Sequence, residues 1–298
     1  MITRLMNVLA RVKSAWHKNS YELLGLFNGG VPEFVKAGRP AALGRGVPVF
    51  HYHVVTAAAL GRDLDYLRVN GYRTLNGDEF LAHLNGTRVF ERPVLLTFDD
   101  GPRNFYDVAY PELRRRSAHA LAFVAPNMHF ESAEAEILRS PQRPMTWAEL
   151  REIHSHGLVD IESHTLESRY VPKWPEPRGL DGIDPEIESR YRSEPRELGE
   201  DLRLSKQMLE ANLPGKRVKH LAFPAYDGSE RAVELARDAG YEACHWGILP
   251  ARGLNLPGDS AMHVARLSSE FICRLPGRGR ASRADVLRRR WDIVRRRT

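Results

Sequence analysis

The chain has 298 residues, of which 42% are hydrophobic and 28% are charged, with a formal net charge of +6 at pH 7. These values are normal for a soluble globular chain, and the length suffices for one domain with a substantial core. The only two cysteines, Cys244 and Cys273, do not form a CxxC pair, which excludes a cysteine-based metal site and is consistent with a reducing compartment.

Strand-like and helix-like segments alternate along the chain. Apolar runs predict strands at 47–54, 94–98, 121–125, 158–162, 220–223 and 262–267. Amphipathic stretches predict helices around 61–69, 110–116, 147–155, 197–212 and 229–239. This alternation predicts a parallel sheet with helices outside it, although periodicity alone does not separate a barrel from an open sheet.

Two adjacent carboxylates, Asp99 and Asp100, end one of these strands in the sequence TFDDG at 97–101. In α/β folds this edge of the sheet is where catalytic groups gather. Two carboxylates so close rarely ionise together without a proton or a cation between them. The pattern indicates a catalytic pair, and a solvated turn is the alternative.

Two later strand ends also carry polar residues. The strand at 158–162 runs into Ser163-His164-Thr165, and the strand at 220–223 ends in the turn Pro224-Ala225-Tyr226. The first strand carries His51 and His53, which lie two residues apart and therefore on the same side of it.

The order of these motifs resembles the polysaccharide deacetylase family, which is carbohydrate esterase family 4 with the NodB homology domain. TFDDG at 97–101 matches the first family motif without a change. The pair Tyr52-His53 and the pair Arg266-Leu267 resemble the opening and closing strands of members that act on poly-N-acetylglucosamine. The resemblance covers roughly 45–270 and implies a distorted (β/α) barrel of the NodB homology type in one catalytic domain.

The resemblance also implies a mechanism, in which a divalent metal, usually zinc, assists hydrolysis of an N-acetyl group. By this comparison Asp99 is the general base, and Asp100 and His164 hold the metal. The backbone N–H of Ala225 is the expected oxyanion donor, a kind of donor whose loss costs about 100–1,000-fold in rate. The Tyr226 ring is expected to line the sugar groove.

The general acid that protonates the leaving amine is harder to assign. The family supplies a His from a late strand, and His263 is the candidate in this chain. The resemblance also places His53 near the pocket. Both residues are therefore catalytic candidates.

The second motif departs from the family pattern. The family has a second metal-binding His four residues after the first, and Ser168 stands at that position here. A neutral hydroxyl is a poor substitute for imidazole on zinc. Three outcomes stay open: a water completes a weaker site, Glu167 or His53 completes it, or metal-dependent catalysis is lost.

Two other functions remain as alternatives to the deacetylase. One is a catalytically silent glycan-binding protein of the same fold. The other is a metal-independent amidohydrolase acting on a small amide. A Pro/Gly-rich loop at 166–200 favours a glycan, because Tyr170 and Trp174 could stack on sugar faces, unless the loop only packs over the barrel.

The two ends of the chain lie outside the resemblance, which divides it into an N-terminal extension (1–44), the deacetylase domain (45–273) and an Arg-rich tail (274–298). The tail holds ten Arg and two Asp, a net charge of +8, so the rest of the chain is close to −2. The spacing of Leu287, Trp291 and Val294 predicts an amphipathic helix that could contact an anionic membrane surface. The alternative is a solvated tail or a helix docked on the barrel.

No nucleic-acid-binding module is recognised. The first 40 residues contain no continuous apolar stretch like that of a signal peptide, and no run of 18 apolar residues suggests a transmembrane helix. We therefore expect a cytoplasmic protein, or one peripheral to the inner membrane, that acts on an N-acetylated surface glycan or its lipid-linked precursor.

Overall fold

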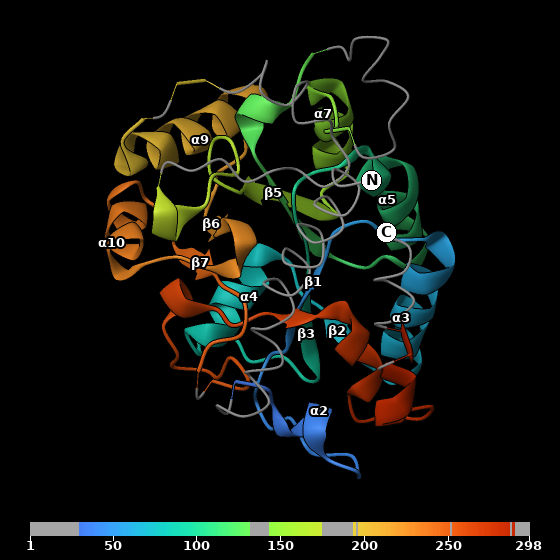
Figure 1. Ribbon diagram of the computed structural model, residues 1–298. Helices are drawn as coiled ribbons and strands as arrows, with labels where there is room; N and C mark the ends of the chain where they lie inside the picture. The colour runs from blue at the N-terminus through green and yellow to red at the C-terminus, as the bar shows by residue number, and fades with distance from the viewer. Residues whose placement is uncertain are drawn as a thin grey trace, which may run out of the picture.

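The computed structural model describes residues 30–131, 143–174, 193–194, 196–250, 252–286 and 288–289. Most of the N-terminal extension and the helix expected from Leu287, Trp291 and Val294 therefore lie outside the described residues. Within the described part, strands run through the centre of the molecule and helices surround them (Figure 1).

The strands form one parallel sheet in the order β7-β6-β5-β4-β3-β1-β8, with β2 paired to the side of β3. His245, the last residue of β7, makes a parallel bridge with Val264. Val264 lies three residues before β8. This bridge links the two ends of the sheet, and the expected distorted (β/α) barrel is confirmed. The strands are β1 (Val49–Tyr52), β2 (Arg73–Thr74), β3 (Pro93–Phe98), β4 (Ala120–Val124), β5 (Val159–Ser163), β6 (His220–Ala222), β7 (Ala243–His245) and β8 (Leu267–Ser268).

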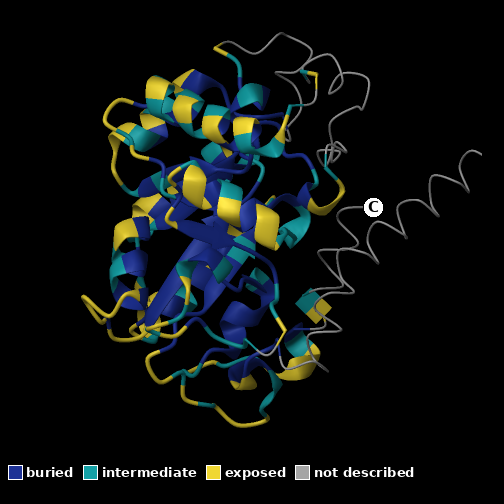
Figure 2. Cartoon of the chain, turned by 90° about the vertical axis from the view of Figure 1, so that its left-hand side faces the viewer, coloured by how far each residue is buried: buried dark blue, intermediate teal, exposed yellow. Residues whose placement is uncertain are grey.

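The helices lie around this sheet, and each turns a buried stripe inward and an exposed stripe outward (Figure 2). A capping box begins α7, since Thr146 Oγ1 accepts from the Glu149 N–H while the Glu149 carboxylate accepts from the Thr146 N–H. The α-helices are α2 (Glu33–Lys36), α3 (Ala57–Val69), α4 (Gly77–Leu84), α5 (Tyr110–Arg116), α7 (Trp147–Ser155), α9 (Leu198–Asn212) and α10 (Glu230–Asp238).

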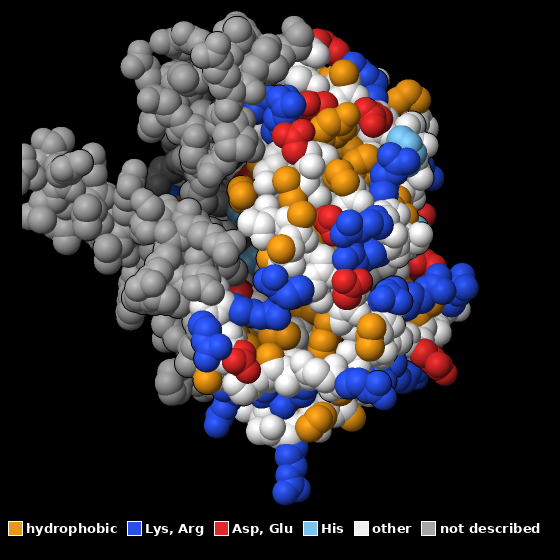
Figure 3. Space-filling view, turned by 90° about the vertical axis from the view of Figure 1, so that its right-hand side faces the viewer, with side chains coloured by type: hydrophobic (Ala, Val, Ile, Leu, Met, Phe, Trp, Pro, Cys, Tyr) orange, Lys and Arg blue, Asp and Glu red, His pale blue; other side chains and the backbone are white. Residues whose placement is uncertain are grey.

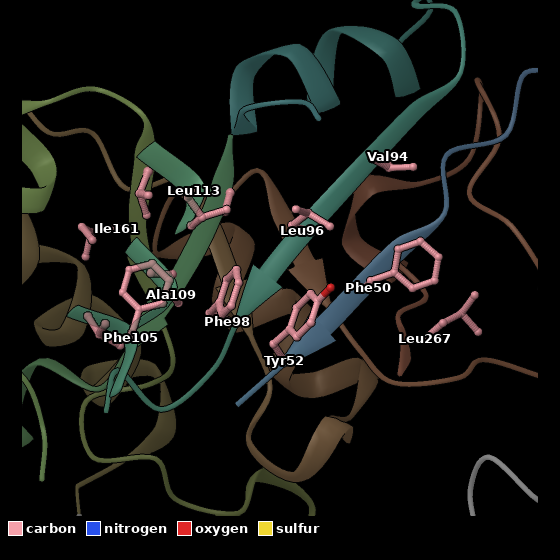
Figure 4. Packing of buried hydrophobic residues seen from close by; sticks show 14 of the residues in the cluster. Phe50, Tyr52, Val94, Leu96, Phe98, Phe105, Ala109, Leu113, Ile161 and Leu267 are labelled. Atoms are coloured by element: carbon pink, nitrogen blue, oxygen red, sulfur yellow. The ribbon is translucent and has the colours of Figure 1, made fainter. Parts of the chain in front are cut away.

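Alternation along the strands sorts side chains onto two faces of the sheet. Tyr52 and Phe98 point to the helix side, where their rings stack with centroids 4.8 Å apart and Phe105 packs edge-on (Figure 4). Their neighbours on the strands face the barrel interior, where Leu95 belongs to a second buried apolar cluster. Because successive residues alternate, Asp99 follows Thr97 onto the interior side.

The predicted elements agree with the structure except in the last strand. The segment predicted as a strand at 262–267 is mostly not one, because Ala261–His263 form a 3₁₀ turn (η5) and only Leu267–Ser268 pair with β1. Ser260 Oγ accepts from the Met262 N–H and so begins the turn. The prediction also missed α2, α4, β2 and β7.

The proposed division of the ends remains a prediction, but described parts of both ends pack together. Arg274 is buried, although the prediction put it at the start of the basic tail. Arg274 and Arg280 donate to backbone carbonyls within 34–38. On the face that Figure 3 shows, basic side chains are interspersed with acidic ones. No helix among the described residues is long and apolar enough to cross a membrane.

Candidate active site

The TFDDG motif occupies the carboxyl edge of the sheet, where β3 ends. Asp100 has φ 68° and Gly101 has φ 59°, so the chain turns sharply after Asp99 and the strand alternation stops. A Cβ on Gly101 would lie 2.7 Å from Val124 and 2.9 Å from His129, which explains why only glycine fits. The turn directs Asp100 toward His164 and His53, while Asp99 stays on the interior side.

Asp99 forms a fully buried ion pair. Arg266 Nη1 donates to Asp99 Oδ1 over 2.7 Å, and both side chains are at most 1% exposed. The same guanidinium donates to Thr97 Oγ1 and to the Trp246 carbonyl. Burial alone would raise the pKa of Asp99, but the charges of Arg266, His164 and His53, together with the hydrogen bond from Arg266, lower the pKa to about 2. Asp99 is therefore ionised at neutral pH.

Asp100 faces two imidazoles. Its Oδ1 lies 3.4 Å from His164 Nε2, and its Oδ2 lies 3.7 Å from His53 Nε2. His164 Nδ1 is 2.8 Å from the Ala222 carbonyl, which can only accept, so Nδ1 carries a proton. Nε2 of this buried ring has no hydrogen-bond partner. A nitrogen and a carboxylate oxygen facing each other in this way can share a proton or a metal ion.

The turn after His164 is buried and strained. Thr165 has φ 62° and Ser168 has φ 54°, and such left-handed residues cost roughly 1–2 kcal/mol each. Both hydroxyls are buried without a hydrogen-bond partner. The Leu166 N–H donates to Asp201, and burial raises the pKa of that carboxyl to about 7. Asp201 thus holds the turn through the backbone of Leu166.

Glu167 is occupied by contacts within the loop. Its carboxylate accepts from Asn127 and Ser193 and pairs with Arg169 over 2.8 Å. These contacts fix the loop and do not point to a role as metal ligand. Among the described residues, no three His, Cys, Asp or Glu side chains are grouped in a way that holds a metal ion.

Tyr226 lies beside the two strand histidines. Its hydroxyl is 3.3 Å from His51 Nδ1 and 3.3 Å from His53 Nε2, and its ring stacks obliquely on His51 with centroids 4.5 Å apart. The Arg266 guanidinium lies over the same ring at 5.5 Å. Tyr226 thus contacts both the residue that holds Asp99 and the residue that faces Asp100.

The backbone around Tyr226 is specialised to place this ring. Ala225 has φ 58° and Tyr226 has φ 67°, two consecutive left-handed residues. Gly247 leaves the room that they need, because a Cβ there would lie 2.7 Å from the Tyr226 Cβ. The predicted oxyanion role of the Ala225 N–H remains a prediction.

Two further predicted residues, Tyr170 and Trp174, are held by hydrogen bonds to other segments. Tyr170 donates to Asp227 over 3.2 Å, and Trp174 Nε1 donates to the Arg196 carbonyl over 2.7 Å, so both rings are tied to neighbouring segments. Their stacking on sugars remains a prediction.

The structure does not bring His263 to the carboxylates. In the described part of the chain its ring stacks on Trp246 and its Nε2 contacts Glu230, with no hydrogen bond or ion pair to Asp99 or Asp100. The general-acid role of His263 remains a prediction, as does that of His53, which faces Asp100.

Three residues with a place in this site were not assigned a role from the sequence: Arg266, His51 and Asp201. The sequence position of Arg266 did indicate a buried partner, because a charged residue directly before an apolar strand end needs one. His51 was predicted to share a side with His53, and the structure confirms this through Tyr226. Asp201 lies within a helix, and nothing in the sequence pattern indicated its contact with the turn.

Two adjacent carboxylates therefore lie at the carboxyl edge of a distorted (β/α) barrel, one paired with Arg266 and the other facing two imidazoles. A family model described as polysaccharide deacetylase matches residues 87–244. The chain is 24% identical over 246 residues to the putative polysaccharide deacetylase YxkH of Bacillus subtilis, covering 79% of this chain and 75% of that protein. It is 30% identical over 122 residues to the poly-beta-1,6-N-acetyl-D-glucosamine N-deacetylase of Escherichia coli, covering 39% of this chain but 18% of that protein.

Among solved structures, IcaB from Ammonifex degensii aligns with a TM-score of 0.59 at 25% identity, covering 76% of this chain and 92% of that one. The chain belongs to the polysaccharide deacetylase family. It is an enzyme of that type, a hydrolase acting on carbon–nitrogen bonds other than peptide bonds, and its substrate class is an N-acetylated polysaccharide.

Proposed function

We propose that this enzyme removes N-acetyl groups from N-acetylglucosamine units of a surface polysaccharide or of its lipid-linked precursor, with the help of a divalent metal. The observation that carries the proposal is the pairing of an ionised, Arg-held carboxylate, Asp99, with a second carboxylate, Asp100, that faces His164 and His53. The similarity to deacetylases named for poly-N-acetylglucosamine supports the choice of sugar.

Asp99 acts as the general base in this proposal. It takes a proton from the attacking water, whose oxygen forms a bond to the acetyl carbon. Arg266 keeps the base ionised and fixes its orientation by donating to Oδ1. A positioned base of this kind typically contributes about 100–10,000-fold to the rate.

Asp100 and His164 would hold the metal. The buried Nε2 of His164, with its lone pair toward Asp100, fits that role because the proton is on Nδ1. A divalent ion bound there lowers the pKa of water and polarises the acetyl carbonyl. His53 is the proposed general acid: it gives a proton to the leaving nitrogen as the carbon–nitrogen bond breaks, which yields acetate and a free amine.

Acetate release from N-acetylglucosamine oligomers tests this proposal. We expect release from β-1,6-linked oligomers, faster than from β-1,4-linked oligomers of the same length. The absence of acetate from both oligomers, with retained glycan binding, would contradict the proposal and favour a silent binder. Turnover of small amides without acetate release would instead favour the amidohydrolase. The predicted location, in the cytoplasm or at the inner membrane, is tested separately by cell fractionation.

A further inference from the structure

A cleft lies on the outside of the barrel, between the π-helix η1 (Phe105–Ala109), α5 and α7. Its volume is about 450 Å³, within the range of about 300–1,000 Å³ that is usual for small-ligand sites. Its lining comes from these helices and not from the strand ends that carry the carboxylates. The lining residues are Tyr106, Asp107, Tyr110, Pro111, Arg114 and Glu152.

The backbone beside this cleft has an uncommon conformation. In η1 the Tyr110 N–H donates to the carbonyl of Phe105, five residues earlier. The wide turn leaves room for Pro111, whose ring in an α-helix would clash with the carbonyl of Asp107. Single π-helical turns occur frequently at functional sites, and this one begins four residues after Gly101 of the TFDDG motif.

Two contacts hold the walls of the cleft in place. The Tyr106 hydroxyl donates to Glu152 Oε2 over 2.7 Å, which links η1 to α7 and raises the pKa of Tyr106 to about 12. The Arg114 guanidinium lies over the Tyr110 ring, 5.7 Å from its centroid. A carboxylate accepts several hydrogen bonds, so Glu152 keeps acceptor capacity for a ligand. The cleft is therefore preorganised for binding.

Tyr110 contributes an unsatisfied hydroxyl to this region. Only 3% of Tyr110 is exposed, and its hydroxyl has no hydrogen-bond partner. Burial raises the pKa of this hydroxyl, so the group stays a neutral donor. Buried hydroxyls are normally paired, and an unpaired one lowers stability. An unpaired hydroxyl on a residue that lines a cleft indicates a ligand.

The mixture of groups indicates the chemistry of that ligand. Asp107 pairs with Arg103 over 2.8 Å. Glu152 and Arg114 are the other charged residues of the lining and have opposite signs, so the charges balance. The tyrosine rings offer apolar faces, while the carboxylates and the guanidinium offer acceptors and donors. A sugar has matching surfaces, because C–H groups form its faces and hydroxyl groups its edge. The lining therefore fits a glycan better than a strongly charged ligand.

We propose that this cleft binds a segment of the N-acetylated polysaccharide outside the catalytic pocket and so holds the polymer while acetyl groups are removed. Two contacts with one polymer chain raise its effective concentration at the catalytic site. The inference rests on the proposed function for the identity of the glycan. It adds a binding site that the catalytic residues do not form.

The length of the substrate tests the inference. Acetate release is measured on short N-acetylglucosamine oligomers, which fill only the catalytic pocket, and on long ones, which reach both sites. Glu152→Ala and Tyr110→Phe should each raise KM for long oligomers about 2–10-fold, as loss of one hydrogen bond or aromatic contact does, and leave kcat unchanged. KM for short oligomers should stay at the wild-type value. Glu234→Ala, exposed on α10, is the matched control and should change neither KM.

Thermal unfolding separates glycan binding from folding. Because the Tyr110 hydroxyl is unpaired in the free protein, Tyr110→Phe should keep or raise the Tm. A lower Tm would overturn the assignment of this hydroxyl to a ligand. Unchanged KM for long oligomers in both variants would overturn the inference. So would an equal rise of KM for short and long oligomers, because the effect would then lie in the catalytic pocket.

Direct binding lets the two proposals fail separately. If no N-acetylated glycan releases acetate, the proposed function is rejected, and calorimetry with the same long oligomers decides the inference. Weaker binding in Glu152→Ala would then support the cleft, and wild-type affinity would overturn it. Acetate release with wild-type KM for long oligomers in both variants would keep the deacetylase and reject the cleft.

Discussion

Arg266 Nη1 lies 2.7 Å from Asp99 Oδ1, and this ion pair is entirely buried at the carboxyl edge of the barrel. The two residues are 167 positions apart, so the pair fixes the closing segment of the chain onto the strand that carries the motif. Removing one partner of a buried pair is costly, because the other charge is left without compensation.

Replacing Arg266 should raise the pKa of Asp99. Arg266→Met is expected to lose about 3–5 kcal/mol of stability, whereas Arg266→Lys keeps the charge but not the three-way donation to Asp99, Thr97 and Trp246. In Arg266→Lys the acid limb of the kcat/KM profile should move to higher pH, since the base then protonates more easily. An acid limb that stays in place would show that Arg266 does not control the base.

Gly101 in the TFDDG motif should be irreplaceable for steric reasons. Gly101→Ala combines a left-handed backbone penalty of about 1–2 kcal/mol with overpacking against Val124 and His129, worth about 1–3 kcal/mol more. Gly71→Ala is the matched control, because Gly71 has φ 69° but open space around it. Chemical denaturation measures both. Equal losses of stability would mean that the clash has no effect.

The hydroxyl of Tyr226 should contribute through the two strand histidines. Tyr226→Phe keeps the ring on His51 and is expected to lower kcat/KM about 2–10-fold, as loss of one hydrogen bond of 0.5–1.5 kcal/mol does. Tyr226→Leu also removes the ring contacts with His51 and Arg266 and should cost more. Steady-state kinetics distinguish the two variants, and equal effects would rule out a specific role of the hydroxyl.

A buried histidine pair inside the barrel should make stability depend on pH. His220 Nδ1 lies 3.0 Å from His245 Nε2, and burial lowers the pKa of His220 to about 4 and that of His245 well below its ordinary value. The unfolded chain therefore binds more protons below pH 6.5, and stability is lost as pH falls from about 6.5 toward 4. For His220 the loss is at most roughly 3 kcal/mol.

Unfolding midpoints in urea between pH 4 and 7 measure this effect. His220→Gln should flatten the slope, and some slope should remain because burial also lowers the pKa of His129 to about 4. His156→Gln, on an exposed ring, should leave the wild-type slope unchanged. A slope in His220→Gln as steep as in the wild type would contradict the assignment.

Local patterns predicted the parts of this molecule that local physics determines. The apolar run before Asp99 and the Gly101 stop specified β3 and its turn, and the alternation of strands and helices specified a parallel sheet. The resemblance to a known family, rather than periodicity, supplied the barrel. Long-range pairs such as Arg266 with Asp99 were not predictable, because no local pattern encodes a contact across 167 residues.

The errors have equally specific causes. The 262–267 segment is apolar enough for a strand, but His263 stacks on Trp246 and a 3₁₀ turn precedes the short strand β8. Helix α4 was missed although Asn76 and Glu79 form a capping box there. The placement of His263 relative to the carboxylates depended on this turn, which no periodicity in the sequence reports.

Acetate release by Asp99→Asn tests the central claim most directly. The substitution keeps the size of the side chain, and the claim predicts a loss of about 100–10,000-fold in kcat/KM on N-acetylglucosamine oligomers, as for removal of a general base. Asp238→Asn, on the exposed face of α10, is the matched control and should retain full activity. A folded Asp99→Asn enzyme that releases acetate at the wild-type rate would contradict the account.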